Sequence, residues 1–235
     1  MNPGNRIRKI TRRIGVWRFS AVELLCSLVL FIVMIPFVED IPNGAFLEPL
    51  LLTLVLGAGL MAVGGRRRIL TVGLFLLVPS VIFRWIHHVS PDLVSPAVFL
   101  GFGLVFIGFV VANILSFILR AGRVDTEVIC AGVSVYLLTG LSWSMAYKLL
   151  GAVSPDAFVF TNVPNAEQEM TSFNAFYFSF STLTSVGYGD ITPASKVARM
   201  LAVMESVTGI LYVAVLISRL VSLYSPLVRE SDKES

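Results

Sequence analysis

The stretch TLTSVGYGDITP (Thr182–Pro193) places an irregular segment inside an apolar part of the chain. An aromatic-rich piece, Phe173 to Thr184, leads into it, and a long apolar segment follows from 197. Neither a helix nor a strand is favoured across Gly187-Tyr-Gly189 followed by an acid. Because glycine accepts a positive φ at little steric cost, the backbone here can alternate between left- and right-handed conformations. Such alternation turns successive carbonyl groups to one side, so we predict an oxygen-lined path.

The composition indicates that this path lies in a membrane. The chain has 235 residues, of which 56% are hydrophobic and 14% charged, and its mean hydropathy is +0.83. Soluble domains average about 25% charged residues, so this chain cannot cover itself with polar surface. At membrane depth, non-helical backbone is tolerated only where protein buries it or where it lines a watery path. No set of nucleophile, base or metal ligands stands out, so we expect no enzyme, no cofactor and no nucleic-acid partner.

Six segments are apolar enough to cross a hydrocarbon core of about 30 Å as helices. They are 21–38, 46–64, 69–86, 93–119, 128–150 and 197–224. Between the last two lies an insert, 151–196, whose apolar piece Phe173–Thr184 is too short to span and suits a re-entrant helix. We therefore predict an all-α membrane protein with six transmembrane helices, a re-entrant pore helix and a filter loop.

Basic residues predict the orientation of these spans. Of the 18 Lys and Arg residues, 14 precede the first span, fill the loops after the second and fourth, or lie at the end of the last. The positive-inside rule then places both termini in the cytoplasm and lets the insert 151–196 dip in from outside. The arm 1–20 has apolar residues at helical spacing and suits a helix on the anionic inner leaflet, with an irregular basic tail as the alternative. Its leaflet-binding residues would be Arg6, Arg8, Lys9, Arg12 and Arg13.

The stretch Thr182-Leu-Thr-Ser-Val-Gly-Tyr-Gly-Asp190 resembles the filter signature of potassium channels, in the bacterial subfamily with six spans and one pore. The similarity covers about 128–224 and implies an outer helix, a turret, a pore helix, a filter and an inner helix. It also implies a homotetramer, in which stacked rings of oxygens replace the water shell of a permeant K⁺. The K⁺ ligands that the resemblance implies are the carbonyls of Ser185, Val186, Gly187 and Tyr188, with Gly189 completing the filter and the Ser185 hydroxyl adding an oxygen.

This chain departs from the family's pattern at two positions. The family usually has threonine where this chain has Ser185, and serine lacks the methyl group that restricts χ1, which leaves the degree of selectivity open. A pore-helix tryptophan usually holds the acid after the filter, and Tyr177 occupies the matching position here, where it would donate to Asp190. Thr171 or Ser172 would cap the pore helix. The remaining predicted filter supports are Thr182 and Thr184.

The last span carries a predicted gating element. Gly209 matches the family's hinge position and would ease bending of the inner helix, although glycine also serves close helix packing. Glu205, one turn earlier, is an acid inside the membrane and therefore a functional candidate. It is either a hydrogen-bonded strut, with Ser181 or Thr182 as partner, or a candidate proton sensor, because burial favours its neutral form. The residues predicted to line the cavity are Ile210, Val213 and Ile217.

The sequence therefore predicts a potassium-selective channel in the plasma membrane, which in a bacterium is the inner membrane. A weakly selective cation channel and a non-conducting sensor or accessory subunit remain alternatives. Voltage gating is not expected, because 93–119 contains no Lys or Arg. We expect four parts: a basic arm (1–20), a peripheral four-helix unit (21–123), a pore domain (124–224) and a short cytoplasmic tail (225–235).

Overall fold

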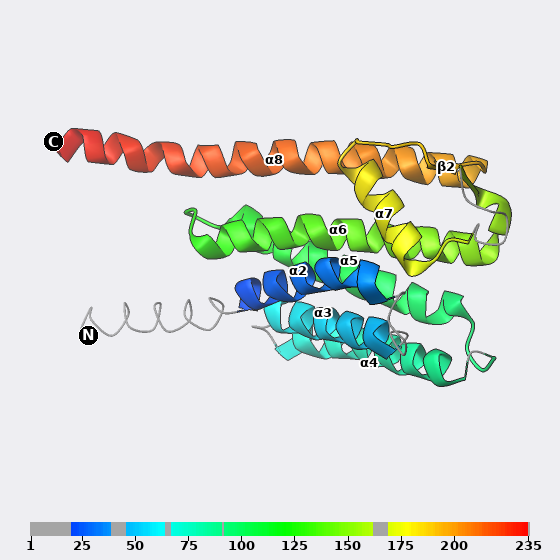
Figure 1. Ribbon diagram of the computed structural model, residues 1–235. Helices are drawn as coiled ribbons and strands as arrows, with labels where there is room; N and C mark the ends of the chain where they lie inside the picture. Colours follow the sequence, from blue (N-terminus) through cyan, green and yellow to red (C-terminus); the bar gives the residue numbers. More distant parts are fainter. Residues whose placement is uncertain (1–19, 39–45, 64–66, 91, 162–168, 235) are drawn as a thin grey trace.

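The computed structural model describes residues 20–38, 46–63, 67–90, 92–161 and 169–234. Its elements are α2 (Ser20–Val38), α3 (Leu47–Val63), α4 (Arg67–Val89), α5 (Pro96–Arg120), α6 (Thr126–Val153), η2 (Pro155–Ala157), β1 (Phe158–Phe160), α7 (Ser172–Leu183), β2 (Ile191–Pro193) and α8 (Lys196–Glu234). Figure 1 shows the long helices side by side, with α8 on one side of the bundle, α2 to α5 on the other and α6 between them. The fold is thus mostly helical.

Five helices in the described ranges are long and apolar enough to cross a membrane. They are Ala21–Val38, Arg68–Val89, Pro96–Arg120, Thr126–Val153 and Lys196–Ser222. The segment predicted as the second span forms α3, an apolar helix of 17 residues. This length is at the lower limit for a spanning helix, so a membrane crossing by α3, and with it a total of six spans, stays a prediction.

Capping residues decide where the helices begin. The fourth predicted span starts at Pro96 and not at residue 93, because the Ser95 hydroxyl caps the helix and accepts from the Ala97 N–H at 3.4 Å. Asp125 caps α6 in the same way, accepting from the Val128 N–H at 3.1 Å. At the other end of the chain, α8 continues to Glu234, past residue 224, where the predicted span stops. Apolar composition predicts where lipid contact ends, whereas the helix itself continues wherever backbone hydrogen bonds persist.

A two-stranded antiparallel ladder, which the sequence did not reveal, lies beside the insert's helix. It pairs Phe158 with Pro193, Val159 with Thr192 and Phe160 with Ile191. The alternation of β1 explains its formation, because Phe158 and Phe160 are buried while Val159 is exposed. In Figure 1 this ladder lies at one end of the bundle, and the α5–α6 connection lies at the other.

Two apolar cores meet at α6. The larger core joins α2, α3 and α5 to one face of α6, with Leu28, Val55 and Ile107 among its fully buried members. The smaller core packs Tyr147 of α6 against Phe158 and Phe178, and so joins α6 to β1 and α7. As a result, α7 is fixed between α6 and α8, where Figure 1 shows it slanting across the bundle.

Candidate functional site

The short helix α7 presents the irregular stretch at its C-terminal end. Thr171 caps its start and accepts from the Asn174 N–H at 3.1 Å, which settles the choice between Thr171 and Ser172. At its end the Thr184 N–H donates to the Phe180 carbonyl at 3.1 Å, and the Thr184 hydroxyl donates to the same oxygen at 2.7 Å. The irregular stretch follows directly, so the negative end of the helix dipole lies at the start of that stretch.

The backbone of the stretch alternates in handedness. Ser185, Gly187 and Gly189 have positive φ angles of 60°, 57° and 83°, whereas Val186 and Tyr188 between them do not. Ser185 is the only residue other than glycine with a positive φ among the described residues. This is the alternation predicted from the two glycines, extended by one position. The Val186 and Gly187 N–H groups both donate to the Ser181 carbonyl, at 2.9 and 3.1 Å, which ties the start of the stretch to α7.

The end of the stretch is held from behind. The Tyr177 hydroxyl donates to Asp190 Oδ2 at 2.8 Å, as predicted, and partial burial together with this bond raises the pKa of Tyr177 to about 12. The Tyr188 ring stacks on the Tyr177 ring with centroids 5.8 Å apart and planes 9° apart. The Thr161 N–H donates to the Asp190 carbonyl at 2.8 Å, so the new ladder also fixes the end of the stretch.

Glu205 is completely buried and bonded at both oxygens. The Tyr147 hydroxyl donates to Oε2 at 2.6 Å, and Ser179 Oγ lies 2.6 Å from Oε1. Ser179 Oγ also lies 2.7 Å from the Gly140 carbonyl oxygen. The predicted partners were wrong, because Ser181 instead donates to the Phe178 carbonyl at 3.0 Å. The network thus joins α6, α7 and α8 through Glu205 behind the irregular stretch.

Gly209 touches the end of α7. A Cβ built on Gly209 would lie far inside van der Waals contact with the Leu183 carbonyl oxygen. One turn earlier, the Ser206 hydroxyl donates to the Thr182 carbonyl at 3.4 Å, so Thr182 and Thr184 both take part in hydrogen bonds at this helix end. The helix α8 is unbroken through Gly209. In this conformation the glycine therefore permits close packing.

The residues predicted to line a cavity share one face of α8. Ile210, Val213 and Ile217 are all exposed in the single chain. The stretch itself is exposed as well, with Val186 at 54% and Tyr188 at 70%. The single chain therefore leaves both these side chains and the irregular stretch uncovered.

Comparison with known proteins identifies the family of the chain. A family model described as "Ion channel" matches residues 126–225. Protein LctB of Bacillus caldotenax is 37% identical over 102 residues, which cover 42% of this chain and 74% of that protein. The chain belongs to the ion-channel family. It is therefore a channel-type membrane protein rather than an enzyme.

Two further relatives of this channel chain match over shorter stretches. The voltage-gated potassium channel Kch of Escherichia coli (strain K12) is 41% identical over 66 residues, 28% of this chain and 14% of that protein. The two-pore potassium channel 4 of Arabidopsis thaliana is 41% identical over 49 residues, 21% of this chain and 17% of that protein. The chain thus spans a small part of both proteins. No solved structure matches it. The family match begins at α6, so α2 to α5 lie outside it.

Sequence reasoning missed Tyr147 and Ser179 of the channel's buried network. A signal for Ser179 was present, because the residue shares the buried face of α7 with Ala175 and Leu183, four positions away on either side. A lone hydroxyl on a buried apolar face needs a polar partner. No local signal could identify Tyr147 as that network's other donor, because 58 residues separate it from Glu205. The predicted arm residues Arg6, Arg8, Lys9, Arg12 and Arg13 lie outside the described residues.

Proposed function

We propose that this chain is the subunit of a homotetrameric channel that conducts K⁺ passively and selectively across the plasma membrane. The observation that carries the proposal is the alternation of positive φ at Ser185, Gly187 and Gly189, directly after the C-terminal end of α7. Two relatives whose printed names include "potassium channel" support the choice of ion. The alternation allows successive carbonyls to face one axis, where they can replace an ion's water shell.

In this proposal the K⁺ ligands are the carbonyls of Ser185, Val186, Gly187 and Tyr188, together with the Ser185 hydroxyl. One chain supplies only one side of such a site, and several chains around an axis complete it. The dipole of α7 adds a partial negative charge near the inner end of the path. Tyr177 and Asp190 brace the outer end through the hydrogen bond at 2.8 Å.

The uncovered face of α8 supports assembly. Met200, Val203, Val207 and Leu211 lie exposed along the helix, and only 11% of the span Lys196–Ser222 is buried in the single chain. The apolar surface of α8 that the single chain leaves uncovered can be covered by other copies of this chain. Ile210, Val213 and Ile217 would then line the cavity below the filter.

The placement in the membrane follows from the charges. We propose that α3 crosses the membrane in addition to the five longer helices, which gives six spans. Both termini then lie in the cytoplasm, and the insert enters from outside. The arm 1–20 would lie on the anionic inner leaflet. Because α5 carries Arg120 in its last turn but no other basic residue, we propose that voltage does not gate the channel directly.

Glu205 acts in this proposal as a neutral strut. A hydroxyl carries one hydrogen and a carbonyl only accepts, so Ser179 cannot donate to both Gly140 and an ionised Glu205. All the short contacts are satisfied when Glu205 is protonated and donates to Ser179, while Ser179 donates to Gly140 and Tyr147 donates to Glu205. Loss of that proton would cost Ser179 one of its two contacts, because its single hydrogen can then go to Gly140 or to Glu205 but not to both, and a role in proton sensing follows from this loss as a testable alternative.

A weakly selective cation channel is the second candidate, and Ser185 favours it. This residue holds a left-handed conformation with φ of 60° without the methyl group that would restrict its side chain. A looser innermost ligand discriminates less between K⁺ and Na⁺. A non-conducting accessory subunit is the third candidate.

A reversal-potential measurement separates the three candidates. The purified chain is reconstituted in a planar bilayer with potassium on one side and sodium on the other. We expect a reversal potential near the potassium limit. A reversal near zero with measurable current would support the weakly selective channel, and no current at any pH or membrane tension would support the accessory subunit.

A further inference from the structure

A cluster of charged and polar side chains connects α2 to α5 with the start of the pore helix α7. Glu48 of α3 forms an ion pair with Arg84 of α4, with Nη2 and Oε1 2.7 Å apart. The Ser172 hydroxyl, on the first residue of α7, donates to the same Oε1 at 2.5 Å. Lys148 of α6 lies 3.5 Å from that oxygen and donates to Ser172. One carboxylate oxygen therefore receives contacts from three other helices.

The cluster is shielded from solvent. The Arg84 side chain is 11% exposed, and those of Glu48 and Lys148 are 24% and 26% exposed. The Arg84 guanidinium also lies 4.9 Å from the centre of the Phe99 ring of α5, in a cation–π contact. In such surroundings, removing one charged partner leaves the other buried and uncompensated, unlike at a solvated surface pair.

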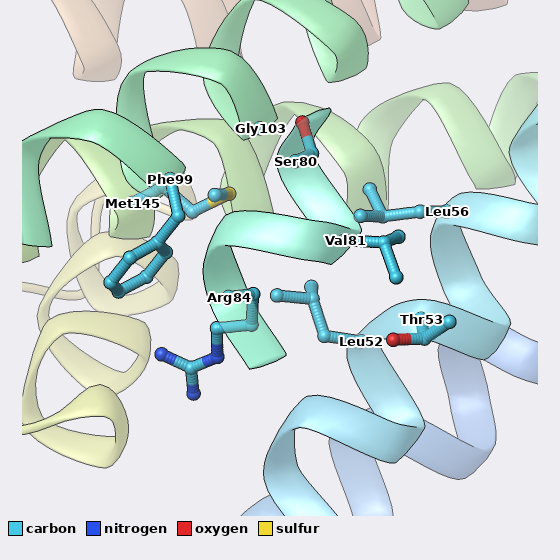
Figure 2. A pocket seen from close by; sticks show the side chains of 9 residues that line it. All are labelled: Leu52, Thr53, Leu56, Ser80, Val81, Arg84, Phe99, Gly103 and Met145. Carbon is cyan, nitrogen blue, oxygen red and sulfur yellow. The ribbon is translucent and has the colours of Figure 1, made fainter. Parts of the chain in front are cut away.

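Polar contacts join this region to α7 beside the apolar packing of the larger core. Two pockets adjoin the cluster, and Arg84 lines both of them. Figure 2 shows the first of them, with Arg84 among the side chains that line it and Leu52 and Thr53 of α3 nearby. Beside the Glu48–Ser172 bond, an edge-to-face contact of Phe31 with Phe176 links α2 to α7. A shift of α3 or α4 can therefore reach α7 through Glu48.

The position of Glu48 also suits the pore helix electrically. The carboxylate lies at the N-terminal end of α7, where the helix dipole favours a negative charge. The helix has 12 residues, and the filter stretch follows its last turn without a linker. A rigid helix of this length passes a tilt at Ser172 on to Thr184, where the filter begins.

The contact forms within a single subunit. Only residues 121–125 separate α5 from α6, and such a connection reaches at most about 20 Å. In the structure α2 and α5 pack directly on α6 of the same chain. The peripheral helices therefore reach the pore helix of their own chain.

We propose that Glu48 is a positioning residue for the selectivity filter, through which the peripheral helices α2 to α5 set the filter's conducting geometry. This inference rests on the proposed channel function. It assigns a task to the part of the chain that the family match does not cover: these helices regulate conduction at the filter through the start of the pore helix.

The test compares four variants of the full chain in planar bilayers. Glu48→Gln removes the charge at constant volume, Ser172→Ala removes the hydroxyl, and the double variant combines them. Glu23→Gln is the matched control, because Glu23 is an exposed acid in the first turn of α2. The readouts are the K⁺/Na⁺ permeability ratio and the sustained fraction of the current. A third readout is the difference between the melting temperatures in KCl and in NaCl, which can be measured even for a protein that conducts no current.

We expect Glu48→Gln and Ser172→Ala each to lower the sustained current about fivefold and to reduce the potassium-specific rise in melting temperature. The double variant should be no worse than the more severe single variant, because both act on the same contact, one through the charge of the acceptor and the other through the donor. Glu23→Gln should behave as wild type. Should Glu48→Gln fail to assemble, Ser172→Ala carries the test, because alanine suits the first turn of a helix.

Two results would overturn the inference. In a conducting wild type, variants with unchanged permeability and sustained current, or with additive effects, would refute the positioning role and leave the channel function standing. A wild type with neither current nor potassium-specific stabilisation would refute both proposals.

Discussion

Replacement of Glu205 tests the buried network most directly. Glu205→Gln keeps the shape of the side chain, and its amide group can donate to Ser179 while its carbonyl accepts from Tyr147. Glu205→Ala removes both contacts, each 2.6 Å long, and leaves the Tyr147 hydroxyl buried without its acceptor. The two variants therefore separate the need for a neutral hydrogen-bonding group from the need for a charge.

The expected magnitudes follow from burial. Tyr147, Ser179 and Glu205 all have 0% exposure. An orphaned buried hydroxyl costs about 1–3 kcal/mol, and the lost side-chain volume adds a cavity. We expect Glu205→Ala to destabilise each subunit by about 3 kcal/mol, which is about two orders of magnitude in the folding equilibrium. Glu205→Gln should cost less than about 1 kcal/mol, because every partner keeps a bond.

The assay is thermal unfolding of the purified protein in detergent, paired with potassium flux into liposomes. Tyr147→Phe is an intermediate control, because it removes one hydrogen bond and keeps the ring packed against Phe178. We expect the order wild type, Glu205→Gln, Tyr147→Phe, Glu205→Ala in both stability and flux. If Glu205→Gln were as damaging as Glu205→Ala, the neutral strut would be refuted and an ionised carboxylate required.

Three further predictions concern the filter and its contacts. Gly187→Ala places a Cβ on a residue with φ of 57°, which costs about 1–2 kcal/mol of backbone strain. The variant should still assemble but should carry no potassium current in bilayers. A current equal to that of the wild type would contradict the proposed alignment of the carbonyls. Tyr177→Phe removes the donor to Asp190 and should speed the decline of sustained current, whereas Tyr177→Trp should restore it by supplying an indole N–H; equal behaviour of the two would show that the bond is dispensable. Gly209→Ala should lower the melting temperature, because the added Cβ clashes with the Leu183 carbonyl. Gly108→Ala is the control: its added Cβ meets no neighbouring side chain or segment within 4 Å, so the melting temperature should stay unchanged or rise. A stable Gly209→Ala protein with impaired current would favour the hinge over close packing.

The backbone conformation of the stretch Thr182–Pro193 could be predicted closely, because glycine conformation is a local property. The two glycines allow positive φ wherever they occur, and the sequence indicated both the alternation and the helix before it. The positive φ of Ser185 was not anticipated, because a serine by itself carries no such preference. The hydrogen bond from Tyr177 to Asp190 was predicted from the resemblance, because Tyr177 occupies the position of the family's pore-helix tryptophan.

Contacts between distant segments could not be predicted in this way. The ladder of β1 and β2 has strands of three residues each, too short for a distinct pattern in the sequence. The predicted partners of Glu205, Ser181 and Thr182, lie on another face of α7 than the observed partner Ser179. The sequence could not show this, because the rotation of α7 about its axis is set by packing against α6 and α8. An error of this size changes which side chain faces inward.

The sequence by itself determined the apolar helices and the irregular stretch between the last two of them, because hydropathy and glycine conformation depend on local composition. It also predicted an orientation from the charges of the loops. Tertiary structure decided which polar groups meet inside the bundle. Glu205 reaches Ser179 across 26 residues and Tyr147 across 58, and Glu48 reaches Ser172 across 124. These pairings depend on how each helix is rotated and shifted against its neighbours, and that arrangement results from packing of the whole bundle.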